Sequence, residues 1–246
     1  MAMPVPSLVL FDLDETLYDH RHASRTGLGM LQSRYPGLAR MTLDALEALA
    51  FETLERVHQR LLRGEVTRDE ARLERLRAVF RHAGEAHDDV AMDRVATAYG
   101  EAYRSAQRAV PGAVALLGRL RETSGVECLG IVTNHFAEVQ EPKLEACGLT
   151  GLVDFMVTSA EVGHLKPAPQ VFHAALERGG CRAQDAVMVG DSWEGDIVGA
   201  QAAGIRPVWF NRRGRTPGAP PRTGTPVSEL AAFEPIEDAC RVILSP

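Results

Sequence analysis

The stretch that decides the fold is residues 7–17, which read Ser-Leu-Val-Leu-Phe-Asp-Leu-Asp-Glu-Thr-Leu. A continuous apolar run that ends in acidic residues is typical of a strand buried on both faces of a parallel sheet. Two acids, Asp12 and Asp14, follow this strand directly. In an open parallel sheet, ligands bind outside the carboxyl ends of the strands. The same stretch therefore predicts both the first strand and the place of the chemistry.

Four more apolar runs of the same kind follow, and helical patterns lie between them. The expected strands cover 127–132, 154–157, 186–189 and 207–210, and the expected helices cover 114–120, 139–147, 171–176 and 197–203. Glycines close three of these helices. Strands that alternate with helices predict right-handed crossovers. We therefore expect an α/β fold, with a Rossmann-like parallel sheet core and helices on both faces.

More than a hundred residues separate the first two expected strands, and they read as helix. Apolar residues recur at helical spacing from Leu43 to Leu61, and Thr-Arg-Asp-Glu at 67–70 is a capping box that opens another helix. We predict a four-helix insertion over 18–106 and a core domain made of 1–17 and 107–246. Residues 211–226 hold four Pro, three Gly and four Arg, which predicts an irregular loop.

Bulk composition excludes several classes of protein. The net charge of -6 argues against nucleic-acid binding, which needs a basic surface. No stretch approaches the roughly 20 apolar residues of a membrane span, and the N-terminus does not resemble a signal peptide. Four cysteines lack metal or redox spacing, which favours free thiols in a reducing cytosol. We expect a cytoplasmic protein, monomer or homodimer, with neither nucleic acid nor membrane as a partner.

Polar residues follow four of the expected strands. They are Asp12, Asp14 and Thr16 after the first, Thr133 and Asn134 after the second, Lys166 after the third, and Asp191 and Asp196 after the fourth. Four carboxylates at one sheet edge would repel one another unless a cation lay among them. Oxygen ligands favour Mg²⁺. The spacing from Asp12 resembles a Ca²⁺ loop, but Leu17 stands where that loop needs Gly, and no P-loop motif is present.

These residue types supply every part of a phosphoryl-transfer site. One carboxylate can attack phosphorus, and a second, two residues on, can act as general acid and then as base. Mg²⁺ and a Lys would offset charge on the transferring group, and a Thr hydroxyl would hold its oxygens. Any single motif is also explained as a helix cap. Four such motifs in order, at four successive strand ends, favour the functional interpretation.

With these motifs, the sequence resembles the haloacid dehalogenase-like superfamily, in particular its phosphatases with a helical cap inserted after the first strand. The resemblance rests on Phe-Asp-Leu-Asp-Glu-Thr-Leu at 11–17, Val-Pro-Gly at 110–112, Thr-Asn at 133–134, Lys-Leu-x-x-x-Gly-Leu at 143–149, Lys-Pro at 166–167 and Val-Gly-Asp-Ser-x-x-x-Asp at 189–196. It covers nearly the whole chain.

The resemblance implies a role for each matching residue. Asp12 would form an aspartyl-phosphate, and Asp14 would protonate the leaving alcohol and then activate water. Thr133 would bind the phosphoryl group, and Lys166 would steady both Asp12 and the phosphoryl oxygens. Mg²⁺ would be held by Asp12, the backbone carbonyl of Asp14 and Asp191, with Asp196 nearby.

Further residues are candidates for substrate binding. They are Thr16, Asn134 and His135 in the core motifs, and His22 and Arg25 where the chain enters the expected cap. A solvated first helical turn is the alternative interpretation of His22 and Arg25. Many relatives have Gly in place of Glu15 and of His135, and the role of His135 stays open.

The sequence thus predicts a Mg²⁺-dependent phosphatase that acts on a small phosphorylated metabolite. A 2-haloacid dehalogenase is an alternative, but that branch of the family needs no metal and typically lacks the second Asp. A phosphomutase and a non-catalytic regulatory protein with this fold also stay open, as does the substrate.

The lysines give a further clue. Lys143 and Lys166 are the two lysines beside 25 arginines. A compact ammonium suits the predicted place of Lys166 better than a guanidinium fork does. Lys143 falls on another family motif, and the sequence predicts no catalytic role for it.

Overall fold

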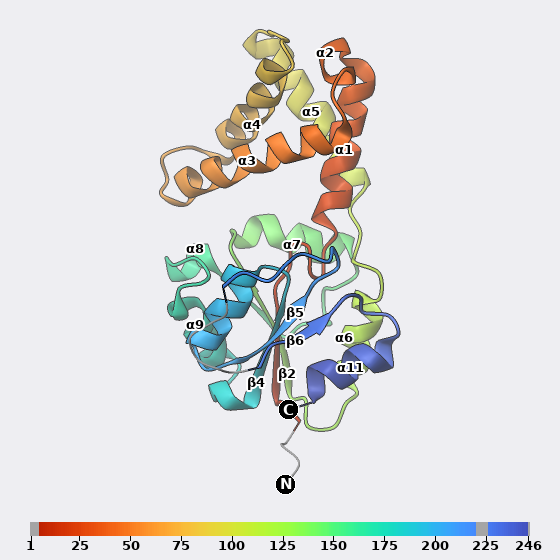
Figure 1. Cartoon of the computed structure of the whole chain (residues 1–246). Coiled ribbons are helices and arrows are strands. Elements are labelled where there is room, and N and C mark those ends of the chain that lie inside the picture. The colour runs from red at the N-terminus through yellow and green to blue at the C-terminus, as the bar shows by residue number, and fades with distance from the viewer. Residues whose placement is uncertain (1–4, 220–225, 246) are drawn as a thin grey trace. The chain divides into compact units, whose positions relative to one another are not determined.

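The computed structural model describes residues 5–219 and 226–245, and within them six parallel strands form one sheet (Figure 1). The strand order is β3-β2-β1-β4-β5-β6. The strands are β1 (Leu8–Phe11), β2 (Cys128–Thr133), β3 (Phe155–Thr158), β4 (Ala186–Gly190), β5 (Arg206–Phe210) and β6 (Ser228–Leu230). Strand order reverses at β1, where Phe11 pairs with Ile131 of β2 on one side and Val189 of β4 on the other. Such a reversal opens a crevice for ligands at the carboxyl ends of the strands.

The five strands expected from apolar runs are confirmed, although most of their ends are shifted by one residue. The parallel sheet is confirmed with them. The sixth, β6, was missed. It has three residues, Ser-Glu-Leu, and only Leu230 is buried. No apolar run marks it because it forms the edge of the sheet, where Phe210 of β5 pairs with Leu230.

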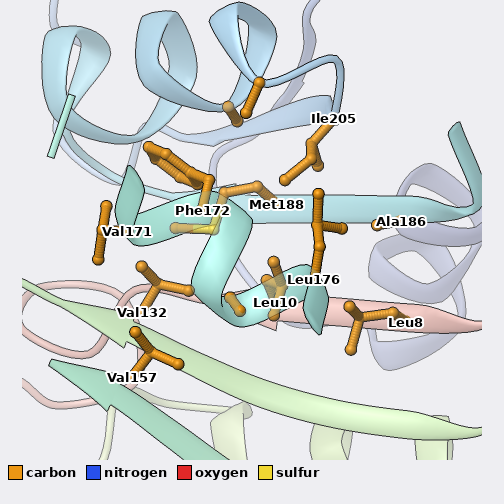
Figure 2. Packing of buried hydrophobic residues seen from close by; sticks show 13 residues of the cluster. Leu8, Leu10, Val132, Val157, Val171, Phe172, Leu176, Ala186, Met188 and Ile205 are labelled. Carbon is orange, nitrogen blue, oxygen red and sulfur yellow. The ribbon is translucent and has the colours of Figure 1, made fainter. Parts of the chain in front are cut away.

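One face of the sheet is covered by α9 (Pro169–Arg178) and α10 (Gly199–Ala202). Figure 2 shows side chains of β1, β2 and β4 directed toward these helices. The ring of Phe172, fully buried, lies in this cluster with Leu10 and Met188. Burying a side chain of this size contributes roughly 1.5–3 kcal/mol. The cluster therefore holds the strand ends, and the residues that follow them, in fixed positions.

The other helices that surround the sheet lie on its opposite face or at the strand ends. They are α6 (Ala113–Arg121), α7 (Ala137–Ala146), α8 (Ser159–Val162) and α11 (Ile236–Leu244), with a short 3₁₀ turn, η1 (Ala183–Asp185), and a π-helical turn, η2 (Trp193–Val198). The helices α6 and α11 pack together beside the sheet (Figure 1). Helices on both faces are thus confirmed, and α11 is an addition to the predicted elements.

The chain divides into two compact units, one formed by the residues up to Asp19 together with those from Arg108 onward, and the other by His20–Gln107. The second unit is helical and has its own buried core, in which Leu31, Phe80 and Met92 take part. Its described residues form five helices rather than the predicted four, because the short α2 was not expected: α1 (His20–Arg34), α2 (Pro36–Ala39), α3 (Leu43–Leu62), α4 (Arg68–His82) and α5 (Asp89–Ser105). The capping box is present, since Thr67 and Glu70 each bond the other's backbone N–H.

Residues 211–219 form no helix or strand, as predicted, and residues 220–225 of the predicted loop lie outside the described residues. The first part of this loop is nonetheless ordered by one side chain. The Asn211 side chain donates to the carbonyl of Arg215 at 2.9 Å and accepts from the backbone N–H of Arg215 at 2.8 Å. It also donates to the Glu229 carboxylate at 2.8 Å. Over the described part of the chain, no helix combines the length and the apolar character needed to cross a bilayer.

Candidate active site

Asp12 occupies the first position after β1, between the ends of β2 and β4. Its backbone N–H donates to the carbonyl of Val189 at 2.9 Å, which continues the β1–β4 ladder by one residue. The side chain is buried. Its Oδ1 accepts from Lys166 Nζ at 2.6 Å, and its Oδ2 accepts from Thr16 Oγ1 at 3.2 Å. The hydroxyl of Thr16, a predicted substrate ligand, is therefore directed at the Asp12 carboxylate.

The Lys166 ammonium is buried and uses three donors on three acceptors. It lies 2.6 Å from Asp12 Oδ1, 2.6 Å from Asp196 Oδ1 and 2.8 Å from the carbonyl of Val132. Burial alone would lower the pKa of Lys166, but the charges of Asp12 and Asp196 outweigh burial and raise it. Three acceptors around one nitrogen match a tetrahedral ammonium, which a planar guanidinium could not replace.

Three carboxylates, Asp12, Asp191 and Asp196, each offer an oxygen within 4.8 Å of the others. Burial, together with the charge of Asp196, raises the pKa of Asp12 to about 7 despite Lys166. Burial and the charge of Asp12 raise the pKa of Asp191 to about 6. The raised pKa values show that the nearby cations do not offset the negative charge of this cluster, and a hard, all-oxygen donor set of this kind fits Mg²⁺. The residues present therefore suit the predicted metal.

The fourth predicted acid, Asp14, directs its carboxylate away from this group. Its Oδ2 accepts from Gln140 Nε2 at 2.9 Å and its Oδ1 from Lys143 Nζ at 2.6 Å, both on α7. The part in metal binding that the family resemblance implies for Asp14 belongs to its backbone carbonyl, and that stays a prediction. Gln140 was missed in the sequence, and Lys143 carried no predicted role.

A tight turn over residues 13–18 fixes the backbone of Asp14. The N–H groups of Leu17 and Tyr18 both donate to the carbonyl of Leu13 at 2.9 Å. Glu15 has φ 68°, a left-handed conformation that favours Gly. A glycine would adopt this conformation without strain. Here the Glu15 carboxylate also forms an ion pair with Arg213 of the loop after β5.

The motif after β4 brings Asp191 and Asp196 to the site through the π-helical turn η2. The backbone N–H of Ser192 donates to Asp196 Oδ2 at 2.9 Å, and Ser192 Oγ accepts from the N–H of Gly195 at 3.1 Å. A Cβ at Gly190 would collide with the Asp196 carboxyl group. The helix predicted from residue 197 therefore starts four residues earlier, because these local bonds wind a π turn that apolar spacing does not reveal.

Thr133 and Asn134, the motif after β2, form hydrogen bonds that hold other residues of the site in place. Thr133 Oγ1 accepts from Gln140 Nε2 at 2.6 Å. The side-chain amide of Asn134 bonds the backbone of Lys166 twice, donating at 3.1 Å and accepting at 2.7 Å, so it holds the segment that carries the ammonium. His135 Nδ1 accepts from the N–H of Phe136 at 3.0 Å, at the start of α7. Among described residues other than Gly, only Glu15 has a positive φ, so His135 does not need glycine's freedom.

Arginines of the loop after β5 also reach the site, and the sequence interpretation missed them. Arg215 Nη2 lies 2.6 Å from Asp191 Oδ2 and donates to the Asp191 carbonyl at 2.7 Å. Arg212 lies 3.6 Å from Asp19. The loop was expected to be irregular only, because nothing in its composition tells which strand ends it covers.

The two candidate substrate residues of the helical unit lie on α1. The Arg25 guanidinium forms ion pairs with Asp44 at 2.5 Å and Glu47 at 2.6 Å, both within the same unit. The carbonyl of His22 accepts from Thr26 Oγ1 at 2.9 Å, a bond within the helix. Substrate contact by His22 and Arg25 stays a prediction.

Comparisons with known proteins agree with this geometry. Residues 6–204 match the model of the family described as haloacid dehalogenase-like hydrolase. Ribulose-1,5-bisphosphate 5-phosphatase from Halopiger xanaduensis is 36% identical over 203 residues, which span 82% of this chain and 84% of that protein.

Solved structures show the same fold. The HAD-hydrolase YfnB from Bacillus subtilis, solved bound to magnesium, superposes with a TM-score of 0.74 at 24% identity, over 97% of this chain and 99% of that one. The 2-haloacid dehalogenase from Pseudomonas syringae pv. Tomato DC3000 has a TM-score of 0.60 at 26% identity, over 95% and 97% of the two chains. Since the family model spans most of the chain and a relative is 36% identical over 82% of it, this protein belongs to the haloacid dehalogenase-like hydrolases.

Proposed function

We propose that the protein is a Mg²⁺-dependent phosphatase that hydrolyses a small phosphorylated metabolite through a phosphoryl group carried on Asp12. The observation that carries this proposal is the different setting of two carboxylates two residues apart. Asp12 is bound by the Lys166 ammonium beside the acidic cluster, whereas Asp14 is held by Gln140 and Lys143. Two carboxyl groups in unlike environments can divide nucleophilic and acid–base work.

In the first half-reaction, a carboxylate oxygen of Asp12 attacks phosphorus and forms an O–P bond. The ester P–O bond breaks, and the leaving alkoxide oxygen takes the proton of the Asp14 carboxyl group. Lys166 and the hydroxyl of Thr133 face the negative charge that spreads over the transferring oxygens. Asp14 ends this step as a carboxylate.

In the second half-reaction, a water oxygen attacks the phosphorus atom bound to Asp12. Asp14 takes the proton from that water, the P–O bond to Asp12 breaks, and inorganic phosphate leaves. Both acids then have their starting protonation states. The same group therefore acts as acid and then as base, which requires the Asp14 carboxyl group to keep one place through both steps.

Asp12, Asp191 and Asp196, with the backbone carbonyl of Asp14, would hold the metal ion. When bound, Mg²⁺ supplies positive charge that offsets the charge of the carboxylates and of the phosphoryl oxygens. Arg215, which reaches Asp191, adds a cation at the rim of the same cluster.

A 2-haloacid dehalogenase is the second candidate, because a solved dehalogenase is 26% identical over nearly the whole chain. In that reaction the nucleophile displaces a halide ion from carbon, and a halide leaves without a proton. A carboxyl group held two residues from the nucleophile then has no leaving group to protonate. Asp14 accepts hydrogen bonds from two side chains of α7, and its presence favours phosphate ester hydrolysis over dehalogenation.

The proposed substrate class is a small phosphate ester, and the free state of all four cysteines supports a reducing, cytoplasmic setting. The Halopiger relative suggests that ribulose 1,5-bisphosphate should be among the first compounds tested. Sugar phosphates, nucleoside monophosphates, phosphoglycolate and acylneuraminate phosphates complete the panel.

The test is hydrolysis of p-nitrophenyl phosphate and of that panel, with Mg²⁺ and with EDTA. We expect release of inorganic phosphate that depends on Mg²⁺. Activity that survives chelation would contradict the metal assignment. Transfer of phosphate to a second site of the substrate, without release, would indicate a phosphomutase, and chloride release from a 2-chloro acid without phosphatase activity would favour the dehalogenase.

A further inference from the structure

We infer that Lys143 is a positioning residue for the general acid and base, with Gln140 as its partner on the same helix. The two side chains hold the Asp14 carboxyl group in the orientation from which it serves the leaving-group oxygen. This inference rests on the proposed phosphatase function, and it gives a role to a lysine that the sequence left unexplained.

Two hydrogen-bond donors fix the Asp14 carboxyl group, one at each oxygen. Lys143 Nζ lies 2.6 Å from Asp14 Oδ1, and Gln140 Nε2 lies 2.9 Å from Asp14 Oδ2. Since each donor takes a different oxygen, rotation of the carboxyl group about its Cβ–Cγ bond would break both bonds. Each oxygen keeps a second lone pair, so a proton can still enter and leave.

The helix α7 delivers both donors because they are three residues apart and lie on one face. Gln140 also donates to Thr133 Oγ1 at 2.6 Å. The general acid is thereby tied to the threonine at the end of β2, and thus to the sheet rather than to its own turn alone.

Burial shows how specific this arrangement is. The side chains of Lys143 and Gln140 are 5% and 0% exposed, respectively, in a chain whose other cationic side chains outside the nucleophile site are arginines. A buried ammonium needs a hydrogen-bond acceptor, and here that acceptor is Asp14 Oδ1. The ring of Tyr18 lies 5.1 Å from Lys143 Nζ, which adds a cation–π contact.

The orientation of the Gln140 side-chain amide leaves one of its polar atoms without a hydrogen bond. Its Nε2 donates to Asp14 and Thr133, while its buried Oε1 finds no hydrogen-bond partner among the described residues. A buried, unsatisfied oxygen opposes folding. The orientation is therefore better explained by its effect on Asp14 and Thr133 than by stability.

The step that depends on this hold is protonation of the leaving group. As the O–P bond to Asp12 forms and the ester P–O bond breaks, the proton passes from Asp14 to the departing oxygen. Lys143 and Gln140 exchange no proton. An alkyl alkoxide needs that proton, whereas 2,4-dinitrophenolate is stable enough to leave without it.

The test compares kcat/KM for two esters, because this ratio covers the chemistry only up to transfer of the phosphoryl group. The esters are the alkyl phosphate turned over fastest in the panel above and 2,4-dinitrophenyl phosphate, both with Mg²⁺. We expect Lys143→Met to lose on the order of 10²-fold on the alkyl ester, the lower end of what general acid catalysis supplies, and at most about 3-fold on the aryl ester. Lys143→Arg keeps a cation near Asp14 and is expected to recover part of the alkyl ester activity.

Two further variants separate positioning from general damage. Gln201→Leu removes a buried glutamine of α10 and is expected to leave the ratio between the esters unchanged. Should Lys143→Met not fold, Gln140→Met makes the same comparison through the other oxygen of Asp14. Because Gln140 also touches Thr133, both esters then lose activity, and the alkyl ester must lose more.

Equal losses on both esters in a folded Lys143 or Gln140 variant would overturn the inference and leave the phosphatase proposal standing. A wild-type protein that hydrolyses neither ester would overturn the proposed function and the inference with it.

Discussion

At the scale of single residues, each of the two lysines is buried against one aspartate of the same turn. Lys166 lies on Asp12 and Lys143 on Asp14, both at 2.6 Å. Elsewhere the chain uses arginine. A tetrahedral ammonium can meet acceptors in three directions within a small volume, which a flat guanidinium cannot do. The choice of lysine is therefore a property of the site rather than of the composition.

We predict that Lys166→Arg inactivates the enzyme although the charge is kept. The guanidinium cannot reach Asp12, Asp196 and the Val132 carbonyl together, so we expect a loss of about 10²-fold or more in kcat/KM for p-nitrophenyl phosphate. Arg178→Lys is the matched control, since it changes an exposed ion pair with Glu161. An Lys166→Arg variant as active as wild type would show that charge alone suffices.

Gly190 leaves room for the Asp196 carboxyl group in the acidic cluster. An added Cβ would collide with the Asp196 carboxyl group, so Gly190→Ala is expected to lower stability by about 1–3 kcal/mol and to reduce activity strongly. Gly118→Ala is the control, because no described atom lies within 4 Å of the Cβ it would add to α6. Urea unfolding and turnover of both variants check this, and an active, stable Gly190→Ala would contradict the placement of Asp196.

At the scale of elements, the loop of residues 211–219 takes part in the site through its arginines. Arg215 pairs with Asp191, a carboxylate that the proposed metal would also use. We predict that Arg215→Gln binds Mg²⁺ about 2- to 5-fold more tightly, because a competing cation is removed from a half-exposed pair worth less than about 1 kcal/mol. Titration calorimetry of the metal measures this. Arg213→Gln, whose partner is Glu15, should change the affinity less, and weaker binding by Arg215→Gln would refute the competition.

The elements also show what the sequence could predict. Five strands were found because each is a continuous apolar run, and the acids and Lys166 were found because they follow those runs. The π turn η2 was missed because side-chain bonds of Ser192 and Asp196 set it, not apolar spacing. Gln140 was missed because an uncharged residue on a helix is noticed only when the facing strand end is known.

At the scale of the whole molecule, the cluster of buried acids would couple the proposed metal binding to folding. The pKa of Asp12 is raised to about 7 and that of Asp191 to about 6, from an ordinary value of 3.8. Between about pH 4 and about pH 7 the folded state thus holds more protons at these groups than the unfolded state does. By linkage, their contribution to stability falls as pH rises through this range in the absence of metal.

A divalent cation should remove this loss, because it binds the ionised carboxylates of the folded state. We predict that excess MgCl₂ raises Tm more at about pH 8 than at about pH 5. Asp191→Asn is the control, and its Mg²⁺-dependent rise in Tm should be smaller at both values. Thermal unfolding in the two buffers measures this, and an equal rise at both pH values would argue against a metal site at these acids.

Asp12 is the residue that we propose receives the phosphoryl group, and one measurement tests that directly. Asp14→Asn, mixed with 2,4-dinitrophenyl phosphate and Mg²⁺, should transfer the phosphoryl group normally but lack the base for the second half-reaction. We predict a burst of one equivalent of dinitrophenolate, and acid-quenched protein that carries one phosphoryl group on the peptide containing Asp12, as found by mass spectrometry. A phosphoryl group on any other residue, or steady hydrolysis by this variant without a burst, would contradict the account.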